Sequence, residues 1–213
     1  MVGRLTVVRA LLCALLVALT QAGVALSHSA EPPAILLAET YNGQIDVSRY
    51  LVSEKLDGVR AVWDGRVLRF RSGNPVHAPA WFVHALPKVP LDGELWLGRG
   101  QFERLSGIVR KEVPVDAEWR DVHYMIFELP GAPGTFAERA AAIRALVRDA
   151  NLPWLREIEQ FSLVDRAALE RKLREVVKAG GEGLMLHRAD APYVTGRSDV
   201  LLKVKPWDDA EAV

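Results

Sequence analysis

One lysine of the chain is placed where its amine could act as a nucleophile. Lys55 follows the extended run SRYLVSEK and precedes the turn residue Gly58 in KLDG. An amine attacks phosphorus only when neutral, and a lysine with an ordinary pKa of about 10.4 reaches that form through desolvation or nearby cations. Lys203 and Lys205 in LLKVKPW have strand spacing, so both could bind an α-phosphate and lower the pKa of Lys55. By itself a KxDG tetrapeptide is a weak signal, which a surface turn with a salt bridge would also explain.

These lysines must be positioned by strands, and the sequence predicts several strands. Residues 60–70 (RAVWDGRVLRF) predict two strands joined by a tight hairpin at Asp64-Gly65, because this dipeptide tolerates positive φ angles. Short apolar runs rich in strand-forming residues follow at 122–129, 182–187 and 199–207. Such runs are typical of strands that are buried in packed sheets.

Two helices are predicted from their end signals. Thr135 and Glu138 form a capping box ahead of a helix over 139–150, and Asp165 can cap a second helix over 166–179. The pair Gly180-Gly181 ends the second helix. Together with the strands, these helices predict a mixed α and β chain.

Composition and charge exclude several classes of protein. The 213 residues contain 27 Lys+Arg and 27 Asp+Glu, with 50% hydrophobic residues, as in a folded globular chain. The single cysteine, Cys13, cannot form an internal disulfide or a thiolate zinc cluster. Residues 55–111 carry ten Lys/Arg against five Asp/Glu. A phosphate-rich partner would bind such a segment, although a solvated face without a partner would explain the charge equally well.

The first 27 residues predict a secretory signal peptide. Arg4 and Arg9 precede an uncharged, largely apolar stretch that ends in the cleavage triplet Ala25-Leu26-Ser27. Leu12 stands before Cys13, which disfavours a lipoprotein anchor. We therefore expect a periplasmic protein with no stable membrane association after cleavage. A misassigned start codon, which adds an apolar extension, is the alternative.

Six motifs in a fixed order carry a resemblance to a known family. In chain order they are KLDGVR, RSGN, LDGELW, YMIFELP, EGLMLH and LLKVKPW, from Lys55 to Trp207. This order resembles the nucleotidyltransferase motif series of ATP-dependent DNA ligases, in particular the short bacterial ligases that are exported to the periplasm. The resemblance implies an α+β adenylation domain of mixed, mainly antiparallel sheets with flanking helices and with ATP between them.

The resemblance also implies domain boundaries. The adenylyltransferase domain would span 28–207, after the signal peptide over 1–27. In the family a C-terminal OB-fold domain follows, which closes on the nucleotide and grips DNA. Residues 208–213 would be the start of that domain, which the printed chain lacks.

Roles for individual residues follow from the same resemblance. Lys55 would attack the α-phosphate of ATP and hold AMP as a phosphoramidate, and Phe127 would stack on adenine. The other expected contacts are Glu54 with the adenine amine, Asp57 and Arg60 with ribose and the nick phosphate, Arg71 with the nick 5′-phosphate, Glu94 with ribose or metal, Glu182 with a divalent metal, and Lys203 with Lys205 on the reacting phosphate. Carboxylates suit Mg²⁺ or Mn²⁺, and cations suit the charge that builds on phosphorus.

The resulting hypothesis is an ATP-dependent DNA ligase, acting as a monomer, that seals 3′-OH/5′-phosphate nicks in duplex DNA during repair, replication or recombination. One departure is Glu128, where the family usually has Asp after the stacking Phe. The alternatives are an RNA ligase or a capping-type guanylyltransferase, which share the lysyl-nucleotide chemistry, and a truncated nick-binding module with little turnover. His77, His84, His123 and His187 lack metal-ligand spacing and are expected to be structural.

Overall fold

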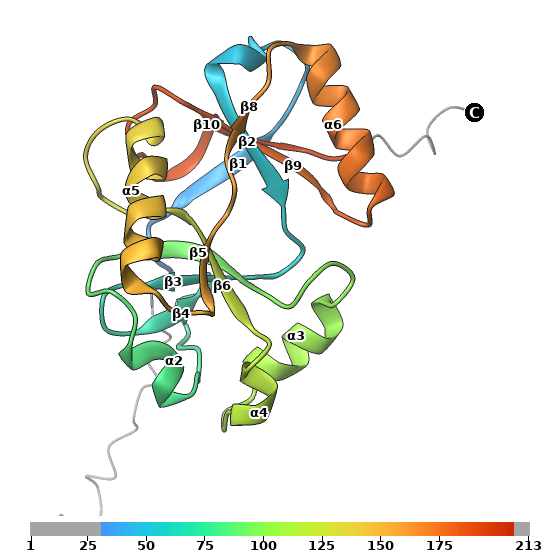
Figure 1. Ribbon diagram of the computed structural model, residues 1–213. Coiled ribbons are helices and arrows are strands. Elements are labelled where there is room, and N and C mark those ends of the chain that lie inside the picture. The colour runs from blue at the N-terminus through green and yellow to red at the C-terminus, as the bar shows by residue number, and fades with distance from the viewer. Residues whose placement is uncertain (1–30, 207–213) are drawn as a thin grey trace, which may run out of the picture.

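Two five-stranded β-sheets form the frame of the protein, shown in a computed structural model that describes residues 31–206 (Figure 1). The strands are β1 (Leu36–Thr40), β2 (Tyr50–Lys55), β3 (Val59–Trp63), β4 (Leu68–Phe70), β5 (Leu91–Trp96), β6 (His123–Glu128), β7 (Leu155–Glu157), β8 (Phe161–Ser162), β9 (Gly183–Arg188) and β10 (Gly196–Val204). The first sheet has the order β1-β10-β9-β2-β8 and the second the order β4-β3-β5-β6-β7. Only the β1–β10 and β6–β7 pairs are parallel in these sheets. The predicted fold class of mixed, mainly antiparallel sheets is confirmed.

The chain enters the second sheet once and returns once. Strands β3 to β7 are all in the second sheet, between β2 and β8 of the first. The two crossings are residues 56–58 and 158–160. Lys55 is the last residue of β2, so it stands where the chain leaves one sheet for the other.

The helices are the 3-10 helix η1 (Val47–Arg49) and the α-helices α2 (Ala80–His84), α3 (Phe102–Val109), α4 (Asp116–Trp119), α5 (Phe136–Ala150) and α6 (Arg166–Lys178). Helix α6 covers the first sheet and α2, α3 and α4 cover the second, whereas α5 runs alongside both (Figure 1). The predicted capping box of α5 is present, with Thr135 and Glu138 bonded in both directions. Asp165 caps α6 by accepting from the backbone N–H of Ala168, at 2.7 Å. Both predicted helices are therefore confirmed.

Strand alternation divides the side chains of the first sheet between a core and the opposite face. Val52 on β2, Leu186 on β9 and Leu202 on β10 pack with Leu169 and Val176 of α6. In the second sheet, the core includes the fully buried rings of Phe82 and Trp119, whose centroids are 4.8 Å apart. Since successive strand residues point to opposite faces, the strand neighbours of Val52, Leu186 and Leu202 turn toward the space between the sheets.

Two local predictions need correction. The hairpin between β3 and β4 forms, but its turn centres on Gly65 and Arg66, because Asp64 pairs through its backbone N–H with the carbonyl of Val67. The Asp64 carboxylate instead accepts from the N–H groups of residues 66 and 67, which a carboxylate does readily in a turn. Strand β10 ends at Val204, so Lys205 stands just beyond the strand.

Some predictions concern residues that the structure does not describe. The signal peptide over 1–27, the first residues of the 28–207 domain, its last residue Trp207 and the segment 208–213 all lie outside residues 31–206. Among the described residues, no helix has the length and apolar character needed to span a membrane.

Candidate active site

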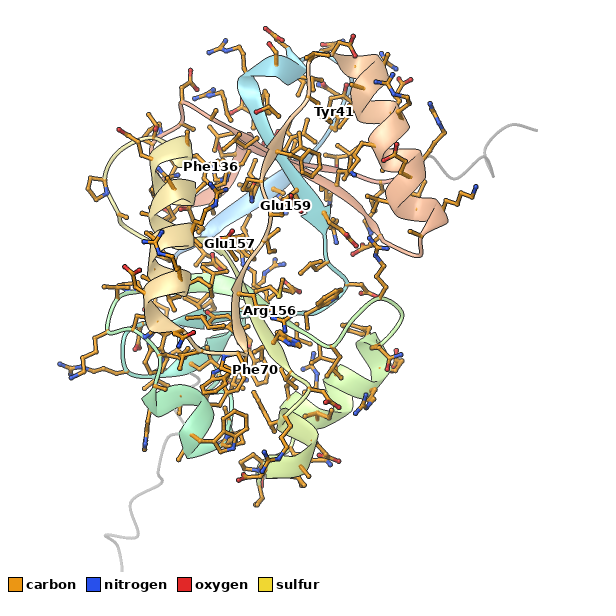
Figure 2. The ribbon with its side chains drawn as sticks, in the orientation of Figure 1. Tyr41, Phe70, Phe136, Arg156, Glu157 and Glu159 are labelled. Atoms are coloured by element: carbon orange, nitrogen blue, oxygen red, sulfur yellow. The ribbon has the colours of Figure 1, made fainter. Side chains whose placement is uncertain are left out.

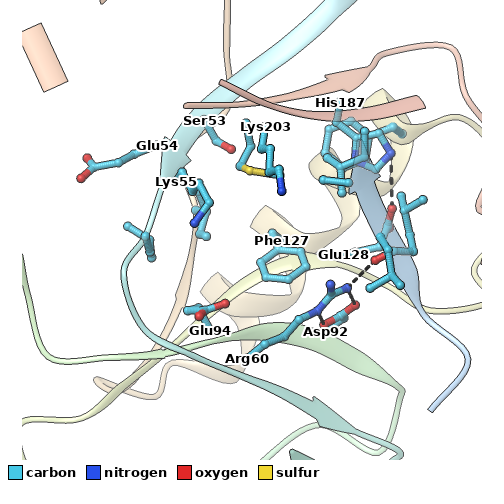
Figure 3. A pocket seen from close by; sticks show the side chains of 18 of the residues that line it. Ser53, Glu54, Lys55, Arg60, Asp92, Glu94, Phe127, Glu128, His187 and Lys203 are labelled. Atoms are coloured by element: carbon cyan, nitrogen blue, oxygen red, sulfur yellow. Dashed lines mark hydrogen bonds and ion pairs between the residues drawn. The ribbon is translucent and has the colours of Figure 1, made fainter. Parts of the chain in front are cut away.

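A cavity of about 300 Å³ lies between the two sheets (Figure 3). From the first sheet its wall takes Ser53 and Lys55 of β2, Met185 and His187 of β9, and Leu201 and Lys203 of β10; from the second it takes Arg60, Asp92, Glu94, Phe127 and Glu128. Apart from Glu128, which follows Phe127 directly, these residues alternate along their strands with core residues. The period-2 pattern of each strand therefore assembles a polar cavity from segments that are distant in the sequence.

Lys55 is held in an ion pair at one end of this cavity. Its Nζ lies 2.5 Å from Oε2 of Glu182, and Nζ of Lys205 lies 2.6 Å from Oε1 of the same carboxylate. Burial alone would raise the pKa of Glu182, but hydrogen bonds from Lys205 and Lys55 hold that pKa below its ordinary value. Glu182 is therefore an ionised carboxylate between two ammonium groups. Three residues that the sequence predicts to act together are in contact.

Glu94 brings a second carboxyl group to this end of the cavity. Burial raises the pKa of Glu94 to about 8, although the nearby charges of Arg60 and Lys55 pull the pKa downward. A close backbone approach explains why glycine occupies position 58 of the KLDG motif. A Cβ there would meet the Leu95 carbonyl oxygen at 2.4 Å and Cγ of Glu94 at 2.6 Å. The glycine thus lets the crossing from β2 to β3 pass directly over Glu94.

Phe127 forms part of the cavity wall with Arg60 packed against its ring. The guanidinium carbon of Arg60 lies 5.2 Å from the ring centroid, and Arg60 pairs with the fully buried Asp92 at 3.0 and 2.6 Å. A third bond joins Arg60 to the Leu36 carbonyl at 2.8 Å. These bonds use Nε and one terminal nitrogen of the guanidinium, and Arg60 lines the cavity, so its predicted contact with ribose and the nick phosphate stays a prediction. Arg60 also supports the Phe127 ring.

Glu54 is also bound by a side chain of the protein. It shares a face of β2 with Tyr50 and Val52, which pack against the α6 side, while Ser53 and Lys55 face the cavity. Arg99 binds both carboxylate oxygens of Glu54, at 2.8 and 2.7 Å (Figure 3 shows Glu54 turned away from Lys55). Glu54 also lines the cavity, so its predicted contact with the adenine amine stays a prediction.

The remaining predicted residues are divided between the cavity and the surface. Lys203 faces the cavity from β10, and Arg71 reaches its edge from the turn after β4. Asp57 is exposed in the crossing after Lys55 and is not part of the cavity wall. The structure therefore brings Lys55, Glu94, Phe127, Glu182, Lys203 and Lys205 into one region, with Arg71 at its edge.

Sequence reasoning missed a buried polar cluster at the other end of the cavity. Arg139 of α5 binds Glu128 through two bonds, at 2.7 and 2.9 Å, and His187 Nε2 lies 3.8 Å from Glu128. The ring of His187 stacks on Phe136 with centroids 3.5 Å apart. Burial, with the charges of Arg139 and Arg188, lowers the pKa of His187 to about 3, so this imidazole is neutral. Only the tertiary fold joins these residues, and the spacing of the sequence contains no signal for them.

Two carboxyl groups near Lys55, those of Glu94 and Glu182, could bind a metal ion. Within residues 31–206 no cluster of three His, Cys, Asp or Glu side chains forms a protein-only metal site. Glu94 and Glu182 lie at the same end of the cavity, and the charge of Glu182 adds to the burial that raises the pKa of Glu94. Mg²⁺ typically binds through one or two carboxylates and completes its shell with phosphate oxygens and water. The donor set therefore fits a metal that arrives with a phosphorylated ligand.

Comparison with known proteins tests the resemblance directly. No protein-family model matches the chain. A solved structure from a structure-function analysis of Lig E DNA ligases, concerned with DNA binding with a minimal scaffold, superposes with a TM-score of 0.78 at 44% identity. That match covers 82% of this chain and 69% of the other. The chain belongs to the DNA ligase family. The resemblance drawn from the six motifs is confirmed.

Other DNA ligases match at lower coverage or identity. A DNA ligase of Haemophilus influenzae is 35% identical over 171 residues, which are 80% of this chain and 63% of that relative. The chain thus spans less than two thirds of that ligase. The Chlorella virus DNA ligase-adenylate shares the fold, with a TM-score of 0.68 at 20% identity over 82% of this chain and 69% of the other.

Proposed function

We propose that the chain is the adenylyltransferase part of an ATP-dependent DNA ligase that seals 3′-OH/5′-phosphate nicks in duplex DNA. The observation that carries the proposal is the position of Lys55, at the sheet crossing, in one cavity with an aromatic ring, a second lysine and two carboxylates. The family match adds support, because the Lig E and Haemophilus influenzae relatives are named DNA ligases. Export to the periplasm is proposed from residues 1–27 alone.

The proposed first step forms a covalent lysyl-AMP. Nζ of Lys55 attacks the α-phosphorus of ATP, an N–P bond forms, the bond to the bridging oxygen breaks, and pyrophosphate leaves. The attacking amine must first lose its proton, and the ion pair with Glu182 stabilises the protonated form. Lys55 must therefore leave this pair before it can attack. Lys203, which lines the same cavity, would offset the negative charge of the α-phosphate.

Two further transfers complete the proposed reaction. The 5′-phosphate of the nick attacks the phosphorus of lysyl-AMP and displaces Lys55, which regains its amine. The 3′-OH then attacks the activated 5′-phosphate, the phosphodiester bond forms, and AMP leaves. Arg71 stands at the cavity edge without a hydrogen-bond partner among the described residues. Its guanidinium suits a nick 5′-phosphate, because it can bind phosphate oxygens in pairs.

Mg²⁺ or Mn²⁺ belongs to this proposal, with Glu94 and Glu182 as its protein ligands. When bound, the metal would stabilise negative charge on the phosphate oxygens. Glu182 then has two uses, since the same carboxylate pairs with Lys55 and Lys205 in the described state. Engagement of Glu182 elsewhere would release Lys55 from its ion pair.

The proposal is tested by trapping the intermediate. Incubation with Mg²⁺ and α-labelled ATP should give an acid-labile, base-stable adduct whose label maps to Lys55 by peptide mass spectrometry. Parallel reactions with α-labelled GTP test the capping-type alternative, and a nicked duplex should then consume the adduct. Nick binding without any adduct would instead support the non-catalytic nick-binding module.

The raised pKa of Glu94 predicts a pH-dependent stability. An acid whose pKa is higher in the folded state than its ordinary value of 4.5 binds more protons when folded, so its contribution is present at low pH and is lost as pH rises through about 8. Between these values, stability should fall relative to Glu94→Gln by up to about 1.4 kcal/mol per pH unit. Urea unfolding of both proteins from pH 5 to 9 measures the difference, and parallel curves would contradict the assignment.

A further inference from the structure

The crossing from β7 to β8 lines the cavity with a glutamine whose amide oxygen has no hydrogen-bond partner among residues 31–206. Residues 158–160 connect the two sheets, and Ile158 donates its N–H to the Ile126 carbonyl at 2.9 Å, beside Phe127 (Figure 2 labels Glu157 and Glu159 on this segment). Both Ile158 and Gln160 line the cavity. Oε1 of Gln160 is buried and has no hydrogen-bond partner among the described residues.

The sheet register places this amide beside the proposed base site. Strand β2 pairs with β8 through Leu51 with Ser162 and Val52 with Phe161. One step further along this antiparallel register brings Gln160 next to Ser53, which precedes Lys55 by two residues on the same face. Gln160 and Phe127 also share the wall of a second, smaller cavity. Gln160 therefore lines the same two cavities as the ring on which a base would stack.

A buried hydrogen-bond acceptor without a partner costs folding free energy. A ligand that donates an N–H group to this acceptor would therefore gain binding free energy. Adenine carries an exocyclic amine at C6, whereas guanine carries a carbonyl oxygen there. Building on the proposed function, we propose that Gln160 is a specificity-determining residue that accepts a hydrogen bond from the adenine amine. Both carboxylate oxygens of Glu54, the other residue predicted to contact this amine, are already bound by Arg99.

The experiment compares nucleotides that differ only at C6 of the base. Adduct formation at low nucleotide concentration is measured with ATP, with inosine triphosphate, which has an oxygen at C6, and with purine riboside triphosphate, which has only hydrogen there. The wild type should favour ATP over purine riboside triphosphate by about tenfold or more, the value of one good hydrogen bond at a buried site. Inosine triphosphate should be the poorest substrate, because its oxygen would face the acceptor.

Variants then assign the preference to Gln160. Gln160→Leu should lower the rate with ATP about tenfold and leave purine riboside triphosphate within about twofold of wild type. Gln160→Glu keeps an acceptor and should keep the preference for ATP. Glu159→Leu is the matched control, since the Glu159 side chain is exposed on the same crossing, and it should change neither rate.

The outcomes separate this inference from the proposed function. An adduct on the wild type with equal rates for ATP and purine riboside triphosphate would overturn the role of Gln160 and leave the ligase proposal intact. The same holds if Gln160→Leu keeps the wild-type ratio of the two rates. A wild type that neither binds nor takes up any of the nucleotides would overturn the proposed function, and the inference with it.

Discussion

Lys55→Ala should abolish the covalent adduct with ATP, with a loss of at least about 10³-fold, because no other group replaces a missing nucleophile. Lys55→Arg should fail to the same extent, since a guanidinium stays protonated and cannot attack phosphorus. The measurement is the yield of labelled protein after incubation with Mg²⁺ and α-labelled ATP, resolved by denaturing gel.

The control must show that the variants still fold. Lys55 and Glu182 are partly exposed, with side-chain exposures of 23% and 25%, so losing their ion pair should cost only about 1 kcal/mol or less. Tm of Lys55→Ala should therefore stay close to the wild type. Lys88→Ala changes an exposed lysine outside the cavity and should keep full adduct yield. Label retained by a folded Lys55→Ala protein would show that another residue is the nucleophile.

Sealing of a nick that already carries AMP offers a second reading of the same variants. Such a substrate skips the two steps that use lysyl-AMP. Only the last step remains, in which the 3′-OH attacks the activated phosphate. Lys55→Ala should therefore lose far less activity on this substrate than in ATP-dependent sealing. The comparison separates the role of Lys55 as nucleophile from any general damage to the cavity.

Much of the frame could be predicted from local signals. The capping residues of α5 and α6 act within one helical turn, and the strands carry continuous apolar runs, so neither depends on distant partners. The motif series likewise identified Lys55, Glu182, Lys203 and Lys205, which the fold brings together. These residues could be found because each lies at or near the end of a strand, and the apolar residues beside it predict that strand.

Glu54 shows how a signal present in the sequence can be overlooked. In SRYLVSEK, the alternation of strand side chains puts Glu54 on the face of Tyr50 and Val52, and Ser53 with Lys55 on the other. An apolar pair at 50 and 52 already indicates that this face is buried against the protein. Strand alternation therefore predicts that the Glu54 side chain points away from that of Lys55, although Glu54 still forms part of the cavity wall.

The surroundings of Arg60, in contrast, could not be predicted from local sequence. Its partner Asp92 belongs to a neighbouring strand, 32 residues further along the chain, and their pairing depends on how β3 and β5 register. Burying a guanidinium requires a matched carboxylate with good geometry, which no local pattern reveals. The same holds for Arg139 and Glu128, which are joined across α5 and β6.

The second large effect is expected from that buried pair. The Arg139 side chain is 1% exposed and Glu128 2% exposed, and Arg139 also donates to the carbonyls of Gly134 at 2.8 Å and Ala191 at 3.2 Å. Arg139→Ala would leave a buried carboxylate without its partner, which typically costs about 3–5 kcal/mol. For a domain of this size the matching fall in Tm is on the order of 6–20 °C.

Arg148→Ala is the matched control on the same helix, because Arg148 pairs with Asp149 in solvent and should contribute at most about 0.5 kcal/mol. The double variant Glu128→Leu/Arg139→Met should be more stable than Arg139→Ala alone, since it removes the charge together with its partner. Arg139 also joins β6 of the second sheet to Ala191, which follows β9 of the first, so its loss should loosen the cavity and weaken ATP binding. If Arg139→Ala melts at the temperature of Arg148→Ala, the pair does not hold the two sheets together, and the cavity depends instead on the sheet crossings at 56–58 and 158–160.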